Sequence, residues 1–156
     1  ARYLDIYANN RHLDTVLFPG IPAILAYLEK QGMRWGVVTN KPAFLTDPLM
    51  STLGLSARAA CIVSGDTTDR SKPHPKPMLH AAELARTPPE DCLYVGDAAR
   101  DVEAGRAAGM RTLVALYGYI DETERPTEWG ADGLIRDPRE ILDWILEADP
   151  SLRRHG

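Results

Sequence analysis

The chain has 156 residues, a length that allows one domain with a proper hydrophobic core and is short for two. Its composition is that of a soluble globular protein, with 44% hydrophobic and 26% charged residues. The formal net charge is −4 and the basic residues are scattered, so neither nucleic acid nor a membrane surface is an expected partner. The longest apolar runs are far too short to span a bilayer.

The cysteines and the start of the chain bear on its location. Cys61 and Cys92 each begin an apolar run that is typical of a buried strand, so two free thiols in a reducing compartment are expected rather than a disulfide or a metal site. No pattern of a secretory signal opens the chain, and a cytoplasmic location is therefore expected. Residues 1–17 are polar and helix-like.

Helical and β-type segments alternate along the rest of the chain. Helices are predicted over residues 21–31, 43–53, 75–86, 100–108 and 138–146, with Gly32, Gly54 and Gly109 as stops. Strands are predicted over residues 34–39, 60–64, 92–95 and 112–116, with a weaker one at 133–135. Strands that alternate with helices and are apolar on both faces predict an α/β fold, with helices on both sides of a parallel sheet.

Ligands of such sheets bind beyond the carboxyl ends of the strands, and the first predicted strand ends in Thr39 and Asn40. A hydroxyl and fresh backbone N–H groups before a helix can hold a phosphate oxygen. The same residues are also common helix caps, so this segment alone leaves both interpretations open.

A proline-rich loop around Lys72 follows the second predicted strand. Three prolines, Pro73, Pro75 and Pro77, stiffen the backbone, which suits a lysine that must point at a fixed anion. The alternative is a surface turn with solvated lysines. His74 has no partner spacing that indicates a base or a metal ligand, so we interpret it as an ordinary loop residue.

Two carboxylates follow the third predicted strand. Asp97 and Asp101 are four residues apart at the start of a helix and therefore lie on the same face. Hard oxygen ligands at a strand end suit Mg²⁺, and Gly96 allows a close backbone approach. The alternative is that both aspartates complement the helix dipole. The fourth strand end, with Tyr117, has no acid, base or anion cradle, and its tyrosines are expected to pack.

In this order, these segments resemble the haloacid dehalogenase superfamily, in its phosphoglycolate phosphatase-like branch. The resemblance rests on three motifs and covers roughly residues 15–147: residues 37–42 (Val-Val-Thr-Asn-Lys-Pro), 71–75 (Ser-Lys-Pro-His-Pro) and 95–101 (Val-Gly-Asp to Asp). Residues 116–120 and 129–132 are also similar to bacterial N-acetylmuramic acid 6-phosphate phosphatases. The implied fold is a Rossmann-like, three-layer α/β core.

The resemblance implies a role for each matched position. Thr39 and Asn40 would hold the phosphoryl group by a hydroxyl and backbone N–H groups. Lys72 would neutralise the phosphate and orient the nucleophile, so that Lys72 and Asp97 form the catalytic set present in the chain. Asp97 would bind Mg²⁺ directly, and Asp101 would bind the metal or its waters. Such sites work mainly by positioning and by stabilising charge.

The family's first motif, Asp-x-Asp-Gly-Thr, supplies the aspartate nucleophile and is absent from the sequence. We therefore expect the nucleophile to lie outside this chain and the chain alone to be inactive. The strand that carries this motif is central in the family, so the sheet is expected to lack its middle strand. Residues 1–12 resemble the last helix of the family's cap, which predicts a cap remnant over residues 1–14 and a core domain over residues 15–156.

The expected function is Mg²⁺-dependent hydrolysis of a small phosphate monoester through an aspartyl-phosphate intermediate, as in a phosphoglycolate phosphatase-like enzyme, and the sequence does not identify the natural substrate. The alternatives are an N-acetylmuramic acid 6-phosphate phosphatase, a β-phosphoglucomutase-like phosphoryl transferase and a non-catalytic phosphate-binding module. The expected partner is a small phosphorylated metabolite, and the sequence does not fix an oligomeric state. A nucleotide-binding domain is disfavoured because no Gly-x-Gly-x-x-Gly or Walker-type loop follows a strand.

Overall fold

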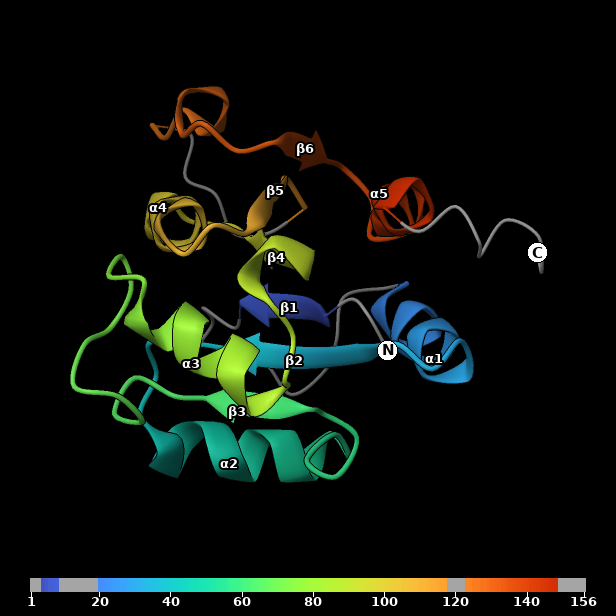
Figure 1. Cartoon of the computed structure of the whole chain (residues 1–156), viewed down its shortest axis with the longest axis vertical. Helices are drawn as coiled ribbons and strands as arrows, with labels where there is room; N and C mark the ends of the chain where they lie inside the picture. Colours follow the sequence, from blue (N-terminus) through green and yellow to red (C-terminus); the bar gives the residue numbers. More distant parts are fainter. Residues whose placement is uncertain (1–3, 9–19, 118–122, 149–156) are drawn as a thin grey trace.

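A computed structural model describes residues 4–8, 20–117 and 123–148 of the chain. Six parallel strands form one sheet in the order β3-β2-β1-β4-β5-β6 (Figure 1). Their bounds are β1 Leu4–Ala8, β2 Arg34–Val38, β3 Cys61–Val63, β4 Cys92–Gly96, β5 Arg111–Ala115 and β6 Gly133–Ile135. The predicted α/β class with a parallel sheet is confirmed.

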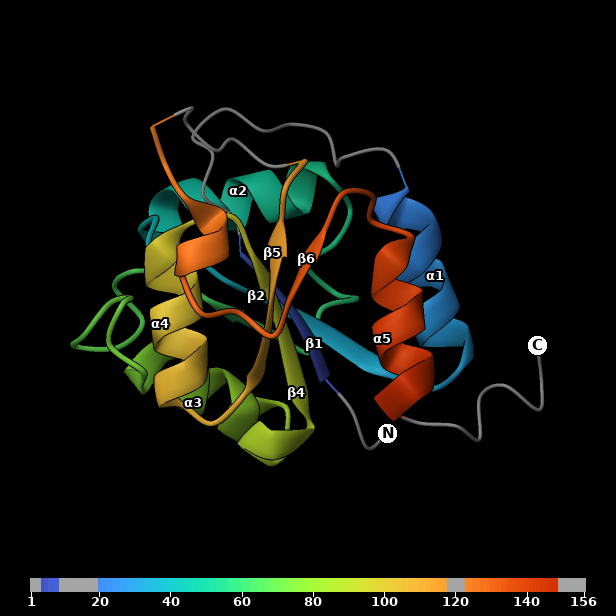
Figure 2. The ribbon, with the colours of Figure 1, turned by 90° about the horizontal axis from the view of Figure 1, so that it is seen from above.

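Within the described residues, five α-helices cover the two faces of the sheet, which makes the three layers visible in Figures 1 and 2. They are α1 Ile21–Lys30, α2 Ala43–Thr52, α3 Lys76–Leu84, α4 Ala99–Ala107 and α5 Glu140–Ala148. Short 3-10 turns, η1 Pro89–Asp91 and η2 Pro126–Glu128, precede β4 and β6. Helices α1, α2 and α5 pack on one face, and α3 and α4 on the other.

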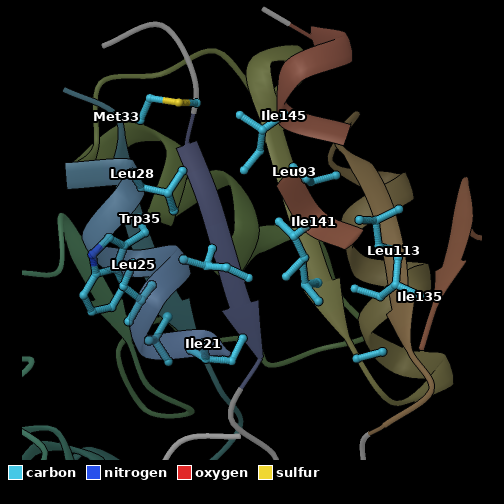
Figure 3. Packing of buried hydrophobic residues seen from close by; sticks show 14 of the residues in the cluster. Ile21, Leu25, Leu28, Met33, Trp35, Leu93, Leu113, Ile135, Ile141 and Ile145 are labelled. Atoms are coloured by element: carbon cyan, nitrogen blue, oxygen red, sulfur yellow. The ribbon is translucent and has the colours of Figure 1, made fainter. Parts of the chain in front are cut away.

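Each face of the sheet has its own hydrophobic core. Figure 3 shows the first of these cores, in which isoleucines and leucines of α1 and α5 pack against alternate residues of β2, β4 and β5. On β4, Leu93 and Val95 face this core, whereas Cys92 and Tyr94 face the core under α3 and α4. This alternation is what a strand buried on both sides requires.

The prediction that the sheet lacks its middle strand is wrong for the described residues. Strand β1, Leu4–Ala8, lies between β2 and β4 and pairs with both. Ile6 stands opposite Gly36 on one side and Tyr94 on the other. The physical reason is that a gap here would leave two rows of unpaired backbone N–H and C=O groups inside the molecule, and β1 satisfies both rows.

Residues 4–8 can do this because apolar side chains occur on both faces of the strand. Ile6 is fully buried in the core under α3 and α4, and Tyr7 packs against the opposite core. The expected helix over residues 1–12 is therefore wrong at positions 4–8, while positions 1–3 and 9–12 lie outside the described residues. The division at residue 14 into a cap remnant and a core stays a prediction.

The other predicted elements are confirmed to within two residues at each end. All three predicted glycine stops, Gly32, Gly54 and Gly109, have φ of 73°, 72° and 85°, in the left-handed region that favours glycine. The residue after each glycine closes the helix with a backbone bond, Met33 N–H to Leu28 O at 2.8 Å in the first case. Among the described helices, none is long and apolar enough to cross a membrane.

Cys61 and Cys92 are both buried, as the sequence predicts, and neither forms a disulfide within the described residues. Burial raises the pKa of the Cys61 thiol to about 11, so at about pH 8 almost none of it is the reactive thiolate. We expect the folded chain to release almost no thionitrobenzoate from Ellman's reagent at that pH, and the urea-unfolded chain to react at both positions. Rapid labelling of the folded chain at Cys61 would contradict the buried placement of β3.

Candidate active site

The candidate site lies where β2 and β4 end, on either side of the central strand β1. From β1 the chain runs outward through β2 to β3, crosses to β4 on the other side of β1, and continues outward through β5 to β6. The loops that follow β2 and β4 therefore lead away from each other. Such a switch point of a parallel sheet is where α/β proteins bind ligands. The loop around Lys72 reaches the same place from the segment between β3 and α3.

Lys72 is the most constrained charged residue of the site. Its side chain is 0% exposed, and its Nζ donates to Asp101 Oδ1 at 2.6 Å, Tyr94 Oη at 2.7 Å and the Val38 carbonyl at 3.2 Å. Burial lowers the pKa of the Lys72 ammonium, and the charge of Asp101 opposes that shift. We take the ion pair as formed, because a charge this deep needs a counter-charge.

Asp101 uses both carboxylate oxygens. Oδ1 accepts from Lys72 and from the Tyr94 hydroxyl at 3.1 Å, and Oδ2 accepts from the backbone N–H groups of Asp97 and Ala98, both at 3.1 Å. The second pair caps the first turn of α4, a role at the start of the helix that is compatible with the helix-dipole alternative stated for this residue. A carboxylate with four such bonds has its acceptor sites filled. The described contacts therefore make Asp101 the partner of Lys72, and its role as a metal ligand stays a prediction that they do not favour.

Gly96 makes the approach of Asp101 possible. A Cβ at position 96 would lie 2.5 Å from Asp101 Cβ and 2.6 Å from its Oδ2. From the sequence, Gly96 is expected to permit a close approach, and the structure shows one at this position. The group that comes close, within the described residues, is the Asp101 side chain.

Asn40 forms a clamp on the lysine loop. Its Nδ2 donates to the Lys72 carbonyl and its Oδ1 accepts from the Lys72 N–H, both at 3.0 Å. The Asn40 side chain thus bonds to the Lys72 backbone with one donor and one acceptor, as a neighbouring strand would. Asn40 was predicted to hold phosphate through its backbone N–H, and that role stays a prediction beside the clamp.

We expect Asn40→Ala to lower the free energy of unfolding by about 1–3 kcal/mol, because the partly buried N–H and C=O of Lys72 lose their partners. Asn40→Asp is the matched control: it keeps the acceptor for the Lys72 N–H but turns an oxygen toward the Lys72 carbonyl, so it should also destabilise. Urea unfolding measures both. Values within about 0.5 kcal/mol of the unsubstituted chain for both variants would show that no clamp exists.

The loop after β2 is anchored to the loop after β3. The Thr39 N–H donates to the Val63 carbonyl at 2.9 Å, and the buried Thr39 Oγ1 accepts from the Lys41 N–H at 3.1 Å. The Gly65 N–H donates to the Lys41 carbonyl at 2.6 Å, and a Cβ on Gly65 would lie 2.0 Å from the Asn40 carbonyl oxygen. Close packing of two loops therefore fixes Thr39 at the strand end.

Asp97 lies directly beyond β4, half-buried, and its charge acts on Lys72. Among the described residues, no group of three or more His, Cys, Asp or Glu side chains is placed to hold a metal ion. Mg²⁺ commonly takes only one or two protein carboxylates and fills its shell with water and phosphate oxygens. One carboxylate at this strand end therefore fits a magnesium ion shared with a bound phosphate, and Asp97 is the residue that would hold it.

Sequence reasoning missed two residues of this region. Tyr94 reaches Lys72 and Asp101 from inside β4, and Asp66 Oδ1 accepts from the Ala43 N–H at 2.9 Å and so caps α2 from another loop. A buried tyrosine that needs a hydroxyl partner was the available signal for the first.

His74 is a loop residue, as expected, and its Nδ1 accepts from the Lys76 N–H at 3.1 Å.

Comparison with known proteins adds to this geometry. The family model described as haloacid dehalogenase-like hydrolase matches residues 1–115. The chain is 42% identical over 146 residues to the N-acetylmuramic acid 6-phosphate phosphatase of Pseudomonas aeruginosa, covering 94% of this chain and 65% of the relative. It is 47% identical over 121 residues to the phosphoglycolate phosphatase of Xylella fastidiosa, covering 78% of this chain and 53% of the relative. The chain thus spans about half to two thirds of the length of these relatives.

Solved structures agree with the fold. A predicted phosphoglycolate phosphatase from Haemophilus somnus superposes with a TM-score of 0.77 at 28% identity, over 83% of this chain and 57% of that one. CbbY from Rhodobacter sphaeroides, solved in complex with phosphate, gives a TM-score of 0.67 at 27% identity, over 75% of this chain and 52% of that one. The strand order, the residues gathered at the strand ends and the family match lead to one conclusion: the chain belongs to the haloacid dehalogenase-like hydrolase family.

Proposed function

We propose that this chain carries the phosphate-binding and magnesium-binding part of a phosphatase that acts on small phosphate monoesters. The observation that supports this most is the meeting of Thr39, Lys72 and Asp97 at the carboxyl ends of the strands that flank β1. The Thr39 hydroxyl can donate a hydrogen bond to an anion, the Lys72 ammonium supplies positive charge, and the Asp97 carboxylate can bind a metal ion. Phosphoryl transfer needs chiefly such positioning and charge stabilisation.

Each residue has a distinct proposed task. Thr39 and the backbone N–H groups after it bind phosphate oxygens, and the cation of Lys72 lowers the energy of negative charge beside it. Asp97 holds Mg²⁺, which when bound would neutralise charge on the phosphate oxygens. The printed sequence contains no Asp-x-Asp motif, so it does not itself supply the attacking aspartate that would form the aspartyl-phosphate.

Two substrates are proposed, and each has its own support. Phosphoglycolate is the compound in the name of the Xylella fastidiosa relative, which is 47% identical to this chain. N-acetylmuramic acid 6-phosphate is the compound in the name of the Pseudomonas aeruginosa relative, whose match extends over 94% of this chain. The ratio of kcat/KM for the two compounds, measured on the product of the complete gene, decides between them.

The phosphate site is tested on the 156-residue chain itself by isothermal titration with orthophosphate, with and without Mg²⁺. We expect binding that Mg²⁺ strengthens, and an Asp97→Ala variant in which that strengthening is lost. Asp91→Ala, in the η1 turn before β4, is the matched aspartate control. The absence of orthophosphate binding would overturn the proposed function.

Turnover is tested separately with p-nitrophenyl phosphate. We expect none above background from a chain whose mass confirms the printed sequence, and magnesium-dependent hydrolysis from the complete gene product. Hydrolysis by the 156-residue chain would contradict the assignment of the nucleophile. Orthophosphate binding without turnover by the complete product would favour a non-catalytic phosphate-binding module.

A further inference from the structure

The hydrogen bonds of Lys72 leave none of its donors unused. An ammonium has three N–H groups, and Nζ has three acceptors, of which Asp101 Oδ1 at 2.6 Å and Tyr94 Oη at 2.7 Å are the closer ones. The Val38 carbonyl at 3.2 Å is the longest of the three bonds. Lys72 therefore cannot donate to a bound phosphate without giving up a bond, and the bond to Val38 is the weakest.

The direction of that third bond matters. Val38 is the last residue of β2, and Thr39, the proposed phosphate ligand, follows it. An N–H that points at the Val38 carbonyl thus points to the end of the strand where the anion would bind. Lys72 can exchange this one bond for a phosphate oxygen while two others hold its Nζ in place.

Tyr94 supplies one of those two fixed bonds and supports the other. Its hydroxyl accepts from Lys72 and donates to Asp101 Oδ1 at 3.1 Å, which closes a triangle of three buried groups. The Lys72 Nζ also lies 5.4 Å from the centre of the Tyr94 ring. Tyr94 is only 1% exposed and is held within the core under α3 and α4, so the hydroxyl has a fixed position.

We propose that Tyr94 is a positioning residue: its hydroxyl, together with Asp101, holds two N–H groups of Lys72 so that the third is directed at an anion beyond β2. This proposal rests on the proposed phosphate site. Tyr94→Phe keeps the ring and removes the hydroxyl. One N–H of Lys72 then loses its acceptor, the ammonium turns to recover a partner, and the third N–H is no longer held toward the anion.

The first test is titration of orthophosphate into the chain and into its Tyr94→Phe variant. We expect the dissociation constant to rise by at least about tenfold. Ile141→Val, a buried change in the opposite core, is the control for lost stability alone and should leave the dissociation constant unchanged. Binding by the unsubstituted chain with an equal constant in Tyr94→Phe overturns this proposal only, whereas no binding by the unsubstituted chain overturns the proposed function.

The second test follows the lysine itself. A side chain with 0% exposure and three acceptors should give a slowly exchanging ¹H–¹⁵N signal from its NH₃⁺ group, assigned by its loss in Lys72→Met. We expect this signal to vanish or broaden in Tyr94→Phe and to persist in Ile141→Val. An unchanged signal in Tyr94→Phe would show that the tyrosine hydroxyl does not hold Lys72.

Discussion

We expect the Ile6→Pro variant to lose about 3 kcal/mol or more of the free energy of unfolding. Strand β1 is bonded on both sides, so a proline there removes an N–H from a ladder in the middle of the sheet and leaves the facing carbonyl without a partner. The substitution also removes a fully buried isoleucine from the core under α3 and α4. Large-to-small changes at such positions cost about 2–5 kcal/mol by themselves.

Ile6→Val is the matched control, because it keeps the β-branched shape and the N–H and removes one methylene. Its expected cost is about 0.5–1.5 kcal/mol. Urea unfolding followed by circular dichroism measures both variants, and hydrogen exchange at the Ile6 amide gives an independent reading of its protection. Unfolding of Ile6→Pro at the same urea concentration as the unsubstituted chain would show that residues 4–8 lie outside the sheet.

The second large effect concerns the buried ion pair. We expect Asp101→Asn to lower the free energy of unfolding by about 3–5 kcal/mol, because the substitution keeps the shape of the side chain and leaves the Lys72 cation buried without a counter-charge. The N–H groups of Asp97 and Ala98 can still donate hydrogen bonds to the side-chain oxygen of the asparagine. The loss therefore reports on the charge far more than on the cap of α4.

A double variant separates the charge from the shape. Lys72→Met/Asp101→Asn removes both charges at similar volume, and replacement of a whole buried pair often costs little. We expect it to regain most of the stability lost in Asp101→Asn, which a double-mutant cycle completed with Lys72→Met quantifies. A double variant as unstable as the sum of the two single variants would mean that Lys72 and Asp101 do not interact.

Much of the fold could be predicted because its elements carry local signals. Helix α1 has apolar residues on one face and the stop at Gly32, and β4 is a short apolar run between turn residues. The strand ends could be predicted too, since the carboxyl ends of parallel strands meet at one edge. Thr39, Lys72 and Asp97 were placed in one site for that reason, and the structure brings their segments together.

The strand at Leu4–Ala8 could not be predicted in the same way. Its five residues are few, and the polar residues that follow, from Asn9 to His12, make the whole segment look helix-like. The short alternation of Leu4, Asp5 and Ile6 is too weak a strand signal to decide the element by itself. What selects the strand is the gap between β2 and β4, whose backbone groups come from residues far along the chain. A non-local demand of this kind overrides local propensity.

The roles within the site were also harder to predict than its members. Asp97 and Asp101 look alike from their spacing, yet Asp101 is turned inward to Lys72 and Tyr94 by the close approach at Gly96. The spacing indicates a shared helix face and does not show which carboxylate is buried. Tyr94 escaped notice because its partners come from three separate segments of the chain.

The central place of β1 also sets the order in which the sheet can be closed during synthesis. Strand β1 leaves the ribosome before the strands on either side of it. Strand β2 follows and can pair along one edge of β1, and β3 then pairs with the outer edge of β2. Among the described strands, the partner of the other edge of β1 is β4, residues 92–96, which is made later. A nascent chain that is released before that point presents an open strand edge, the kind of surface that recruits other chains. Emergence of β4, and with it Tyr94, is thus the step that ends this exposure.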